Sequence, residues 1–294
     1  MSKSFQEALK NGKFLITVEL DPPKGVETSD LLRQVQALKD RTDGINLSDN
    51  RGGVMRLAAL PACLLIKQAG GEPILNMACR DKNRLALASE ALGAAALGIS
   101  TILCMTGDHT THGDHKEAKP VYDLDSVQAL KMFKGFNEGK DFNGLSLNGR
   151  PQLCLGAVVT PEADPLEPQL LKFTKKAELG LPFFQTQAVF DLNRLADFMK
   201  FARQYETKII VGLRLLTWAE ISTYQDGSLP GVIVPLPIIE EFRHAGETDG
   251  PKKALEWMVN QIKELKANHL GDGVHIMAMG QEELIPEILT KAGI

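Results

Sequence analysis

Several features that define other classes of protein are missing from this sequence of 294 residues. No apolar run approaches the roughly 20 residues that a helix needs to cross a bilayer. Lys and Arg form no run, and the net charge of −4 provides no basic surface for a nucleic acid backbone. We therefore expect a soluble protein that has neither a membrane nor a nucleic acid as its partner.

Closely spaced cysteines are also missing. The four cysteines lie far apart, without a CxxC motif: Cys63, Cys79, Cys104 and Cys154. Three of them fall inside apolar runs with the character of strands. We interpret all four as reduced, buried thiols of a cytoplasmic protein.

The common nucleotide-binding motifs do not occur either. The sequence contains no GxGxxG and no GxxxxGK[ST], and its GDG at 271–273 precedes a predicted strand instead of following one. These motifs therefore give no sign of a nucleotide cofactor.

An alternation of strand and helix patterns is present along the whole chain. Eight short apolar runs rich in β-branched residues are candidate strands, at 14–20, 44–49, 72–80, 100–108, 152–159, 183–190, 208–214 and 273–280. Amphipathic stretches with helical spacing lie between most of them, for example at 29–40, 84–98 and 166–180. This alternation predicts an α/β fold, a (β/α)8 TIM barrel formed as a single domain over residues 1–294. The longer intervals 109–151 and 215–272 predict enlarged loops after strands 4 and 7.

Polar residues occur where the predicted strands end, which is where barrels of this kind carry their active sites. They are Glu19, Asp21, Ser48, Asp49, Asn76, Arg80, Asp81, Asp108, Gln185, Gln187 and Arg214. Each of them could be a satisfied structural group, but together they favour a polar active site.

Glu19 needs a particular explanation, because it interrupts the buried run FLITVEL just before a double proline. At an apolar barrel mouth, desolvation would raise the pKa of its carboxyl group, as a general acid near neutral pH requires. The structural alternative is a carboxylate that caps the following turn or forms an ion pair with Arg80 or Arg214.

Two other clusters have both a functional and a structural interpretation. His109, His112 and His115, with Asp114, could bind zinc, although a Gly- and Thr-rich loop does not place them on one helical face. Lys172, Lys175 and Lys176 fall at i, i+3 and i+4 of a predicted helix, so they share either a solvated face or a site for the phosphates of a cofactor.

Four short motifs, taken in order, resemble the methylenetetrahydrofolate reductase family. They are ELDPP (19–23), TGD (106–108), TPEADP (160–165) and TQAVFD (186–191). The similarity runs from about Phe14 to Ile210 and returns weakly in GVHIMAMG (273–280).

This resemblance implies a flavoprotein oxidoreductase of one-carbon metabolism and methionine biosynthesis, with non-covalent FAD at the barrel mouth. The reaction would reduce 5,10-methylenetetrahydrofolate to 5-methyltetrahydrofolate by hydride transfer from the reduced flavin. Glu19 matches the family's general acid, Asp108 an aspartate near the flavin and the pterin, and Gln187 a glutamine that binds the folate substrate. Residues at FAD-contacting positions are Ser48, Asn76, Gly107, Asp108, Tyr122, Ala157, Lys175 and Lys176.

The chain departs from the family pattern at several positions. Thr106 replaces an arginine, Asn76 stands where a histidine is expected, and an expected arginine is replaced near Gln281. The segment RLLTWAEIS after the seventh strand replaces the region that usually stacks NADH or NADPH. The electron donor could therefore be NADH, NADPH or a partner protein, such as an iron–sulfur or flavin carrier.

Two rival functions remain open on the sequence. One is a metal-dependent barrel hydrolase or lyase that uses the histidine cluster, and the other is a non-catalytic folate-binding or scaffold subunit of a one-carbon complex. The presence of Glu19, Asp108 and Gln187 together argues against a scaffold. For the reductase we expect no resident metal and an oligomeric state.

Overall fold

A closed barrel of eight parallel strands, arranged in sequence order, forms the centre of the chain. The computed structural model describes residues 4–224 and 232–294. The strands are β1 (Leu15–Leu20), β2 (Gly44–Leu47), β3 (Pro73–Ala78), β4 (Thr101–Met105), β5 (Cys154–Val159), β6 (Phe183–Ala188), β7 (Lys208–Arg214) and β8 (Gly273–Met277). Every strand overlaps a predicted one, so the prediction of a (β/α)8 barrel is confirmed.

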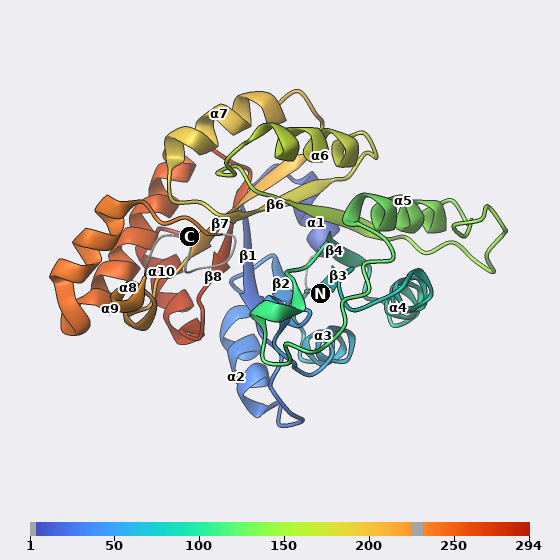
Figure 1. The fold of residues 1–294 in the computed structure, drawn as a ribbon, viewed down its shortest axis with the longest axis horizontal. Coiled ribbons are helices and arrows are strands. Elements are labelled where there is room, and N and C mark those ends of the chain that lie inside the picture. The colour runs from blue at the N-terminus through green and yellow to red at the C-terminus, as the bar shows by residue number, and fades with distance from the viewer. Residues whose placement is uncertain (1–3, 225–231) are drawn as a thin grey trace.

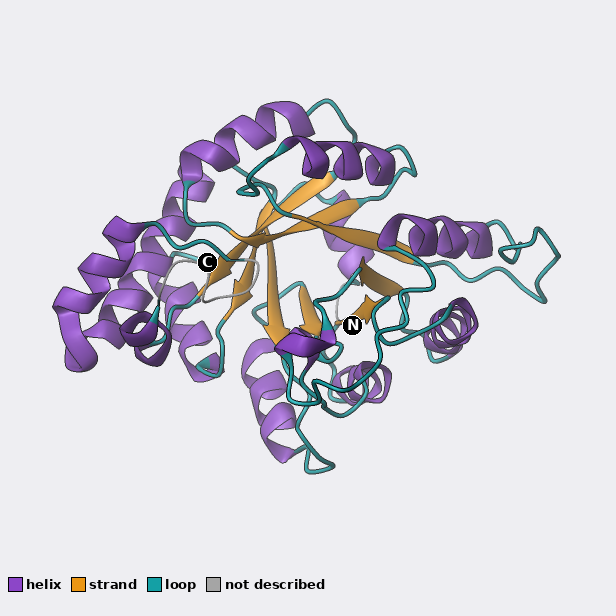
Figure 2. Cartoon of the chain, in the orientation of Figure 1, coloured by secondary structure: helices purple, strands orange, loops and turns teal. Residues whose placement is uncertain are grey.

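Helices form a ring outside the strands, as Figures 1 and 2 show. They are α2 (Ser29–Leu38), α3 (Ala59–Gln68), α4 (Arg84–Ala96), α5 (Ser126–Asn137), α6 (Glu167–Ala177), α7 (Leu192–Ala202), α8 (Trp218–Thr223), α9 (Leu236–Ala267) and α10 (Ile285–Lys291). A further helix, α1 (Phe5–Lys10), lies at one end of the barrel, and the short 3-10 turns are η1 (Arg51–Gly53), η2 (Thr110–His112) and η3 (Glu282–Leu284). The larger apolar core lies between this ring and the strands. The interval after β7 contains α8 and α9, but its residues 225–231 lie outside the described part of the chain.

The N-terminal end of the barrel is closed by α1. A capping box between Ser4 and Glu7 begins this helix, so its first N–H groups are satisfied. Its apolar side packs on the lowest inward-facing side chains of the strands, and the Phe5 ring meets the Phe183 ring edge to face at 5.1 Å. Solvent is thereby excluded from this end, and the opposite end remains for a ligand.

The barrel interior changes from apolar to polar along its axis. Because successive residues of a strand alternate between its two faces, Thr17 and Glu19 point inward together with Leu15, which belongs to the apolar floor. The layer above that floor is polar and consists of Thr17, Asn46, Asn76, Gln185 and His275, all of them buried. Burying polar side chains costs free energy unless they form hydrogen bonds. The hydrogen bonds of this layer therefore belong with the site that lies above it.

The loops after β2 and β4 meet across one side of the mouth. A Cβ atom on Gly113 would lie 1.9 Å from the Gly53 carbonyl oxygen, so the two backbones touch through residues without side chains. Lys24 forms an ion pair with Asp114, which ties the loop after β1 to the same cluster. β4 ends at Met105, earlier than the predicted 108, because Gly107 leaves the extended conformation with φ of 88°. The loops after β1, β2 and β4 are thus joined on this side of the mouth.

The four cysteines are free and buried, as predicted. No described helix combines the length and the apolar character that crossing a membrane requires.

Candidate active site

Glu19 lies at the barrel mouth with its side chain 13% exposed. Its Oε2 accepts a hydrogen bond of 3.2 Å from Asn76 Nδ2, and its Oε1 lies 3.7 Å from Arg51 Nη1. Burial raises the pKa of this carboxyl group from 4.5 to about 6, and nearby Asp21 raises it further, while Arg51, Asn76 and Arg214 oppose the increase. The group can therefore exchange a proton close to neutral pH, as the sequence predicts for a general acid.

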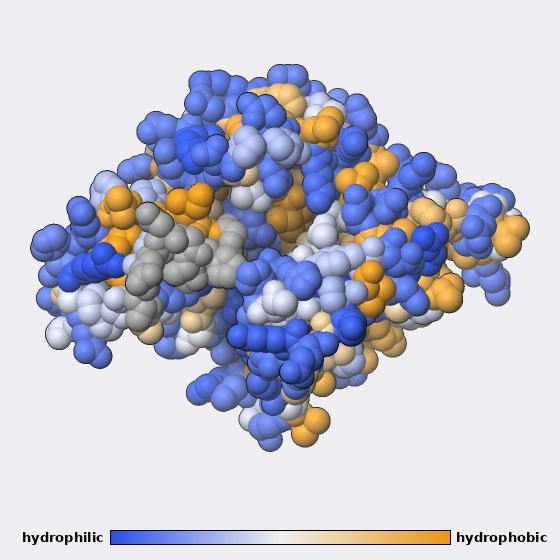
Figure 3. Space-filling model, in the orientation of Figure 1, coloured by the Kyte–Doolittle hydropathy of each residue, from blue (hydrophilic) through white to orange (hydrophobic). Residues whose placement is uncertain are grey.

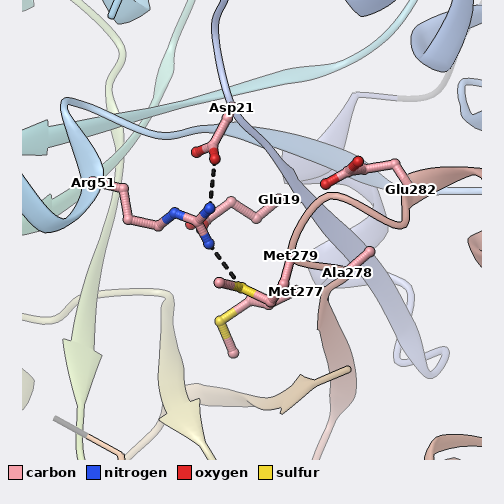
Figure 4. Close-up of a pocket in the computed structure, with 7 residues that line it drawn as sticks. All are labelled: Glu19, Asp21, Arg51, Met277, Ala278, Met279 and Glu282. Carbon is pink, nitrogen blue, oxygen red and sulfur yellow. Dashed lines mark hydrogen bonds and ion pairs between the residues drawn. The ribbon is translucent and has the colours of Figure 1, made fainter. Parts of the chain in front are cut away.

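Arg51 covers Glu19 from the loop after β2. Its Nη2 forms an ion pair of 2.5 Å with Asp21 Oδ2, and its Nη1 lies 2.8 Å from the Met279 sulfur. Figure 4 shows the guanidinium group between Asp21 and Met279, beside Glu19. The pocket around it is lined by Glu19, Asp21, Arg51, Met277, Ala278, Met279 and Glu282.

The loop after β1 is held in place by the loop after β2. Asp21 also accepts a hydrogen bond of 2.5 Å from Ser48 Oγ, and it forms an ion pair of 3.3 Å with Arg56. Arg56 Nη1 in turn donates to the Pro22 carbonyl at 3.1 Å. The double proline after Glu19 therefore lies in a pinned segment, which orients the carboxyl group above the barrel.

The expected ion pairs of Glu19 with Arg80 or Arg214 are not the ones that form. Arg80 is 1% exposed, and its guanidinium group binds Asp81 at 2.7 Å together with the Asn50 carbonyl. Arg214 pairs with Glu220. Arg51, which follows a short strand in a Gly-rich turn, takes the position beside Glu19 because η1 brings that turn over the mouth.

Asp108 and Gln187 lie at the mouth ends of β4 and β6 with exposed side chains. Among the described residues, neither side chain makes a hydrogen bond. The Asp108 carbonyl accepts from Arg80 Nη1 at 3.2 Å, which fixes its backbone. Both side chains are therefore available to a ligand, and the binding roles expected for them stay predictions.

Gly107, Tyr122, Ser48 and Asn76 lie around this end of the barrel. Tyr122 has a left-handed φ of 43°, and its hydroxyl group donates to the Gly107 carbonyl at 3.2 Å. Ser48 and Asn76 are buried, bonded to Asp21 and Glu19 respectively. Asn76, at the position expected for a histidine, thus supports the acid directly.

Ala157 and the lysines occupy different environments. The Ala157 side chain packs in the core between strands and helices, so its backbone is the part that could contact a ligand. Lys175 is exposed, whereas Lys176 is 4% exposed and donates to the Val158 carbonyl at 3.0 Å. Burial lowers the pKa of Lys176 to about 8. The three lysines therefore do not share one solvated face, because Lys176 turns into the protein, and the contact of Lys175 and Lys176 with a cofactor stays a prediction.

The histidine cluster does not form a metal site. His109, His112 and His115 are all exposed, and the His109 ring accepts a hydrogen bond from the Thr111 backbone. Within residues 4–224 and 232–294, no group of three or more His, Cys, Asp and Glu side chains has the arrangement to hold a metal ion.

Three residues of the site escaped sequence reasoning: Arg51, Thr17 and His275. His275 lies one level below Glu19, since β1 and β8 pair Thr17 with His275 and Glu19 with Met277. Alternation along GVHIM, with Gly273 facing the barrel floor, would have placed His275 inward. Arg51 carries no comparable signal, because a loop residue has no periodicity.

The fold and the site together define a (β/α)8-barrel protein in which the largely buried Glu19 carboxyl group, with its pKa raised to about 6, lies at the mouth of the barrel. Figure 3 shows a hollow near the centre of one face, bordered by both hydrophilic and hydrophobic residues. The chain belongs to the methylenetetrahydrofolate reductase family, whose model matches residues 4–293.

Individual relatives are distant. The chain is 22% identical over 237 residues to a probable methylenetetrahydrofolate reductase (NADPH) of Caenorhabditis elegans. The matched region covers 79% of this chain but only 34% of the length of that relative. The structure of this chain is similar to that of an uncharacterised Clostridium thermocellum protein that binds two copies of 5-methyl-5,6,7,8-tetrahydrofolic acid. The TM-score is 0.66, the identity is 16%, and 98% of each chain is covered. A Mycobacterium tuberculosis tryptophan synthase structure matches with a TM-score of 0.53 and 13% identity, over 98% of this chain and 91% of that one.

Proposed function

We propose that this chain catalyses the reduction of 5,10-methylenetetrahydrofolate to 5-methyltetrahydrofolate, with FAD as its cofactor and Glu19 as its proton donor. The observation that carries the proposal is the Glu19 carboxyl group, which lies at the mouth with a pKa raised to about 6. Membership of the reductase family supports it, as does the folate bound by the Clostridium thermocellum neighbour.

The chemistry requires one proton before the hydride. Glu19 donates its proton to N10 of the folate as the bond between N10 and the methylene carbon breaks, which leaves an iminium at N5 and a carboxylate on Glu19. With a pKa of about 6, roughly a tenth of the Glu19 side chains carry this proton at pH 7. Asp108 and Gln187, with exposed side chains at the mouth ends of β4 and β6, on either side of β5, bind and orient the pterin.

The residues at the mouth fit a bound flavin. Arg214 Nε and Gln281 Nε2 are buried donors without a partner among the described residues, and both lie at the mouth ends of β7 and β8. Buried donors of this kind are expected to meet an acceptor on a ligand. Asp108 and the Gly107 backbone are suited to the hydrogen-bonding edge of the ring system, and Lys175 to the diphosphate. FAD, when bound, supplies the hydride that converts the iminium to the methyl group.

The donor of electrons is NADH, NADPH or a reduced partner protein. An absorption spectrum of the purified chain, followed anaerobically, separates these sources. Bleaching of a yellow protein by NADH or NADPH identifies a self-sufficient reductase. A yellow protein that ignores both, but is reoxidised by methylenetetrahydrofolate after chemical reduction, identifies a partner as the donor.

The decisive experiment compares Glu19→Gln with the wild type in that reoxidation step. The variant should bind flavin with a nearly unchanged spectrum and lose on the order of 10² or more in the rate of folate reduction. Glu283→Gln, on the exposed face of η3, is the matched control and should keep the wild-type rate. Full activity of Glu19→Gln would remove Glu19 from the mechanism, and a colourless chain that cannot be reconstituted with FAD would favour a folate-binding scaffold.

A further inference from the structure

Six buried or nearly buried side chains form a ring of polar contacts inside the barrel. Asn76 Nδ2 lies 3.2 Å from Glu19 Oε2, Asn46 Nδ2 lies 2.8 Å from Asn76 Oδ1, and Gln185 Nε2 lies 3.0 Å from Asn46 Oδ1. Gln185 Nε2 also lies 3.1 Å from Thr17 Oγ1, which lies 3.0 Å from His275 Nδ1. The ring closes where His275 Nε2 lies 4.0 Å from Glu19 Oε2. We call these residues the interior ring.

The carboxylate of Glu19 sets the direction of every bond in the interior ring. An ionised carboxylate only accepts, so the amide nitrogen of Asn76 must face it and the Asn76 oxygen must face Asn46. Asn46 then donates its own amide nitrogen to that oxygen and turns its carbonyl oxygen toward Gln185. Gln185 donates to Asn46 and to Thr17 through its amide nitrogen. With Glu19 ionised, this orientation satisfies all the contacts, including a second bond of 2.9 Å from Asn46 Nδ2 to Gln185 Oε1.

The same direction favours one tautomer of His275. Thr17 Oγ1 already accepts from Gln185, so its own proton is free for donation, and His275 Nδ1 at 3.0 Å is the nearer acceptor. If Nδ1 carried the proton instead, Thr17 Oγ1 would accept from it and would donate its own proton to the Val274 carbonyl, at a longer distance of 3.4 Å. A neutral imidazole that accepts at Nδ1 carries its proton on Nε2, and Nε2 is the atom closest to Glu19.

We propose that the interior ring positions the acid: His275, fixed as the Nε2–H tautomer, and Asn76 both direct donors at Glu19 Oε2, so that the proton of the acid form resides on Oε1. Oε1 is the oxygen on the side of Arg51 and the pocket, and Arg51 at 3.7 Å can donate but not accept. The proton on Oε1 therefore has no acceptor in the ring and is left for the substrate nitrogen. This role rests on the proposed function of Glu19, and it makes His275 a positioning residue.

Distance and burial both suit His275 to this role. The gap of 4.0 Å is longer than a hydrogen bond, and contacts of this kind often tighten when the substrate binds. Burial lowers the pKa of His275 to about 3, so the ring stays neutral through the working range of pH. The charged groups that act on Glu19 from the surrounding loops and strands are Arg51, Asp21 and Arg214.

Nitrogen-15 NMR of the histidine-labelled chain tests the tautomer without any assumption about activity. The other five histidines, at 109, 112, 115, 244 and 269, are exposed, and the signals of the buried His275 are identified by their loss in His275→Gln. The proposal requires a protonated Nε2 and an unprotonated Nδ1. Thr17→Val, which removes the hydroxyl donor, should mix the two tautomers, and a protonated Nδ1 in the wild type would overturn the proposal.

Infrared titration of the Glu19 carboxyl group tests the consequence. The acid C=O band is assigned by its loss in Glu19→Gln. His275→Leu, which removes the donor toward Oε2, should raise the pKa of Glu19 by about half a pH unit or more, and the pH dependence of turnover should follow. His275→Gln keeps an N–H donor at the position of Nε2 and should restore most of the wild-type value. His244→Gln, the same change on an exposed ring of α9, should shift nothing.

The two proposals fail in different ways. An unchanged Glu19 pKa in a folded His275→Leu variant would overturn the positioning role while leaving the reductase proposal intact. A chain with the Nε2–H tautomer and the expected shift, but without folate reduction, would support the interior ring and remove the proposed function. If His275→Leu does not fold, the wild-type tautomer and the comparison of His275→Gln with Thr17→Val still decide the question.

Discussion

Replacing Glu19 by Gln should stabilise the folded chain near neutral pH even though it removes the acid. The folded state raises the pKa of Glu19 from 4.5 to about 6, so the folded state holds this proton more tightly than the unfolded state does. The corresponding contribution to stability is fully present below about pH 4.5 and is lost as the pH rises through about 6. The difference of about 1.5 pH units corresponds to about 2 kcal/mol.

Glutamine imitates the protonated carboxyl group at every pH. The free energy of unfolding of Glu19→Gln, minus that of the wild type, should therefore grow by about 2 kcal/mol in favour of the variant between about pH 4.5 and pH 7.5. A constant offset from altered packing cancels in this comparison, and the attraction of Arg51 for the ionised carboxylate is already part of the pKa of about 6. The titration of His275, which both proteins share, cancels as well.

Urea unfolding at a series of pH values measures this difference, followed by far-UV circular dichroism and by the fluorescence of Trp218 and Trp257. Glu283→Gln, on the exposed side of η3, should show a difference that does not depend on pH. If the difference for Glu19→Gln is also independent of pH, burial does not raise the pKa of Glu19, and the physical reason for a general acid at this position is lost.

Three further changes test other parts of the structure. Arg51→Gln removes the main cation that opposes the effect of burial, so it should raise the pKa of Glu19 above about 6. The alkaline limb of the pH–rate profile, measured with chemically reduced protein, should then move to higher pH. Phe5→Ala empties the position against Phe183 at the barrel floor and should lower the free energy of unfolding by about 3 kcal/mol, measured in urea, with flavin binding retained. The double change of His112 and His115 to Ala should leave folate reduction unchanged, and its loss together with bound zinc would revive the metal hypothesis.

Most of the fold could be predicted because the signals for it are local. The eight runs of strand-forming residues and the amphipathic stretches between them are properties of short windows, and the closed barrel follows from their strict alternation. The predicted strand at 100–108 was too long, because the chain turns at Gly107 with a positive φ. Such a turn depends on a single residue and leaves the apolar pattern intact.

The candidate site could be predicted where a residue is conspicuous within its own segment. Glu19 interrupts an apolar run, so its burial and raised pKa were accessible from the sequence. Its partners were not, because they depend on the register between β1 and β8 and on the path of the loop after β2. Arg80 and Arg214 were plausible partners by position, yet each is already bound to a nearer carboxylate.

Asn76, which stands where the resemblance predicts a histidine, helps to keep Glu19 able to act as an acid. The resemblance leads one to expect a histidine there, and an imidazolium beside Glu19 would hold the carboxylate ionised and lower its pKa. Asn76 donates to the same oxygen at 3.2 Å without carrying a charge at any pH. His275 is the histidine that does lie near Glu19, and it is buried deeply enough to stay neutral. Arg51 is thus the closest cation to Glu19, at 3.7 Å from a loop over the mouth, and a substrate that displaces it would raise the pKa of the acid at the moment the proton is needed.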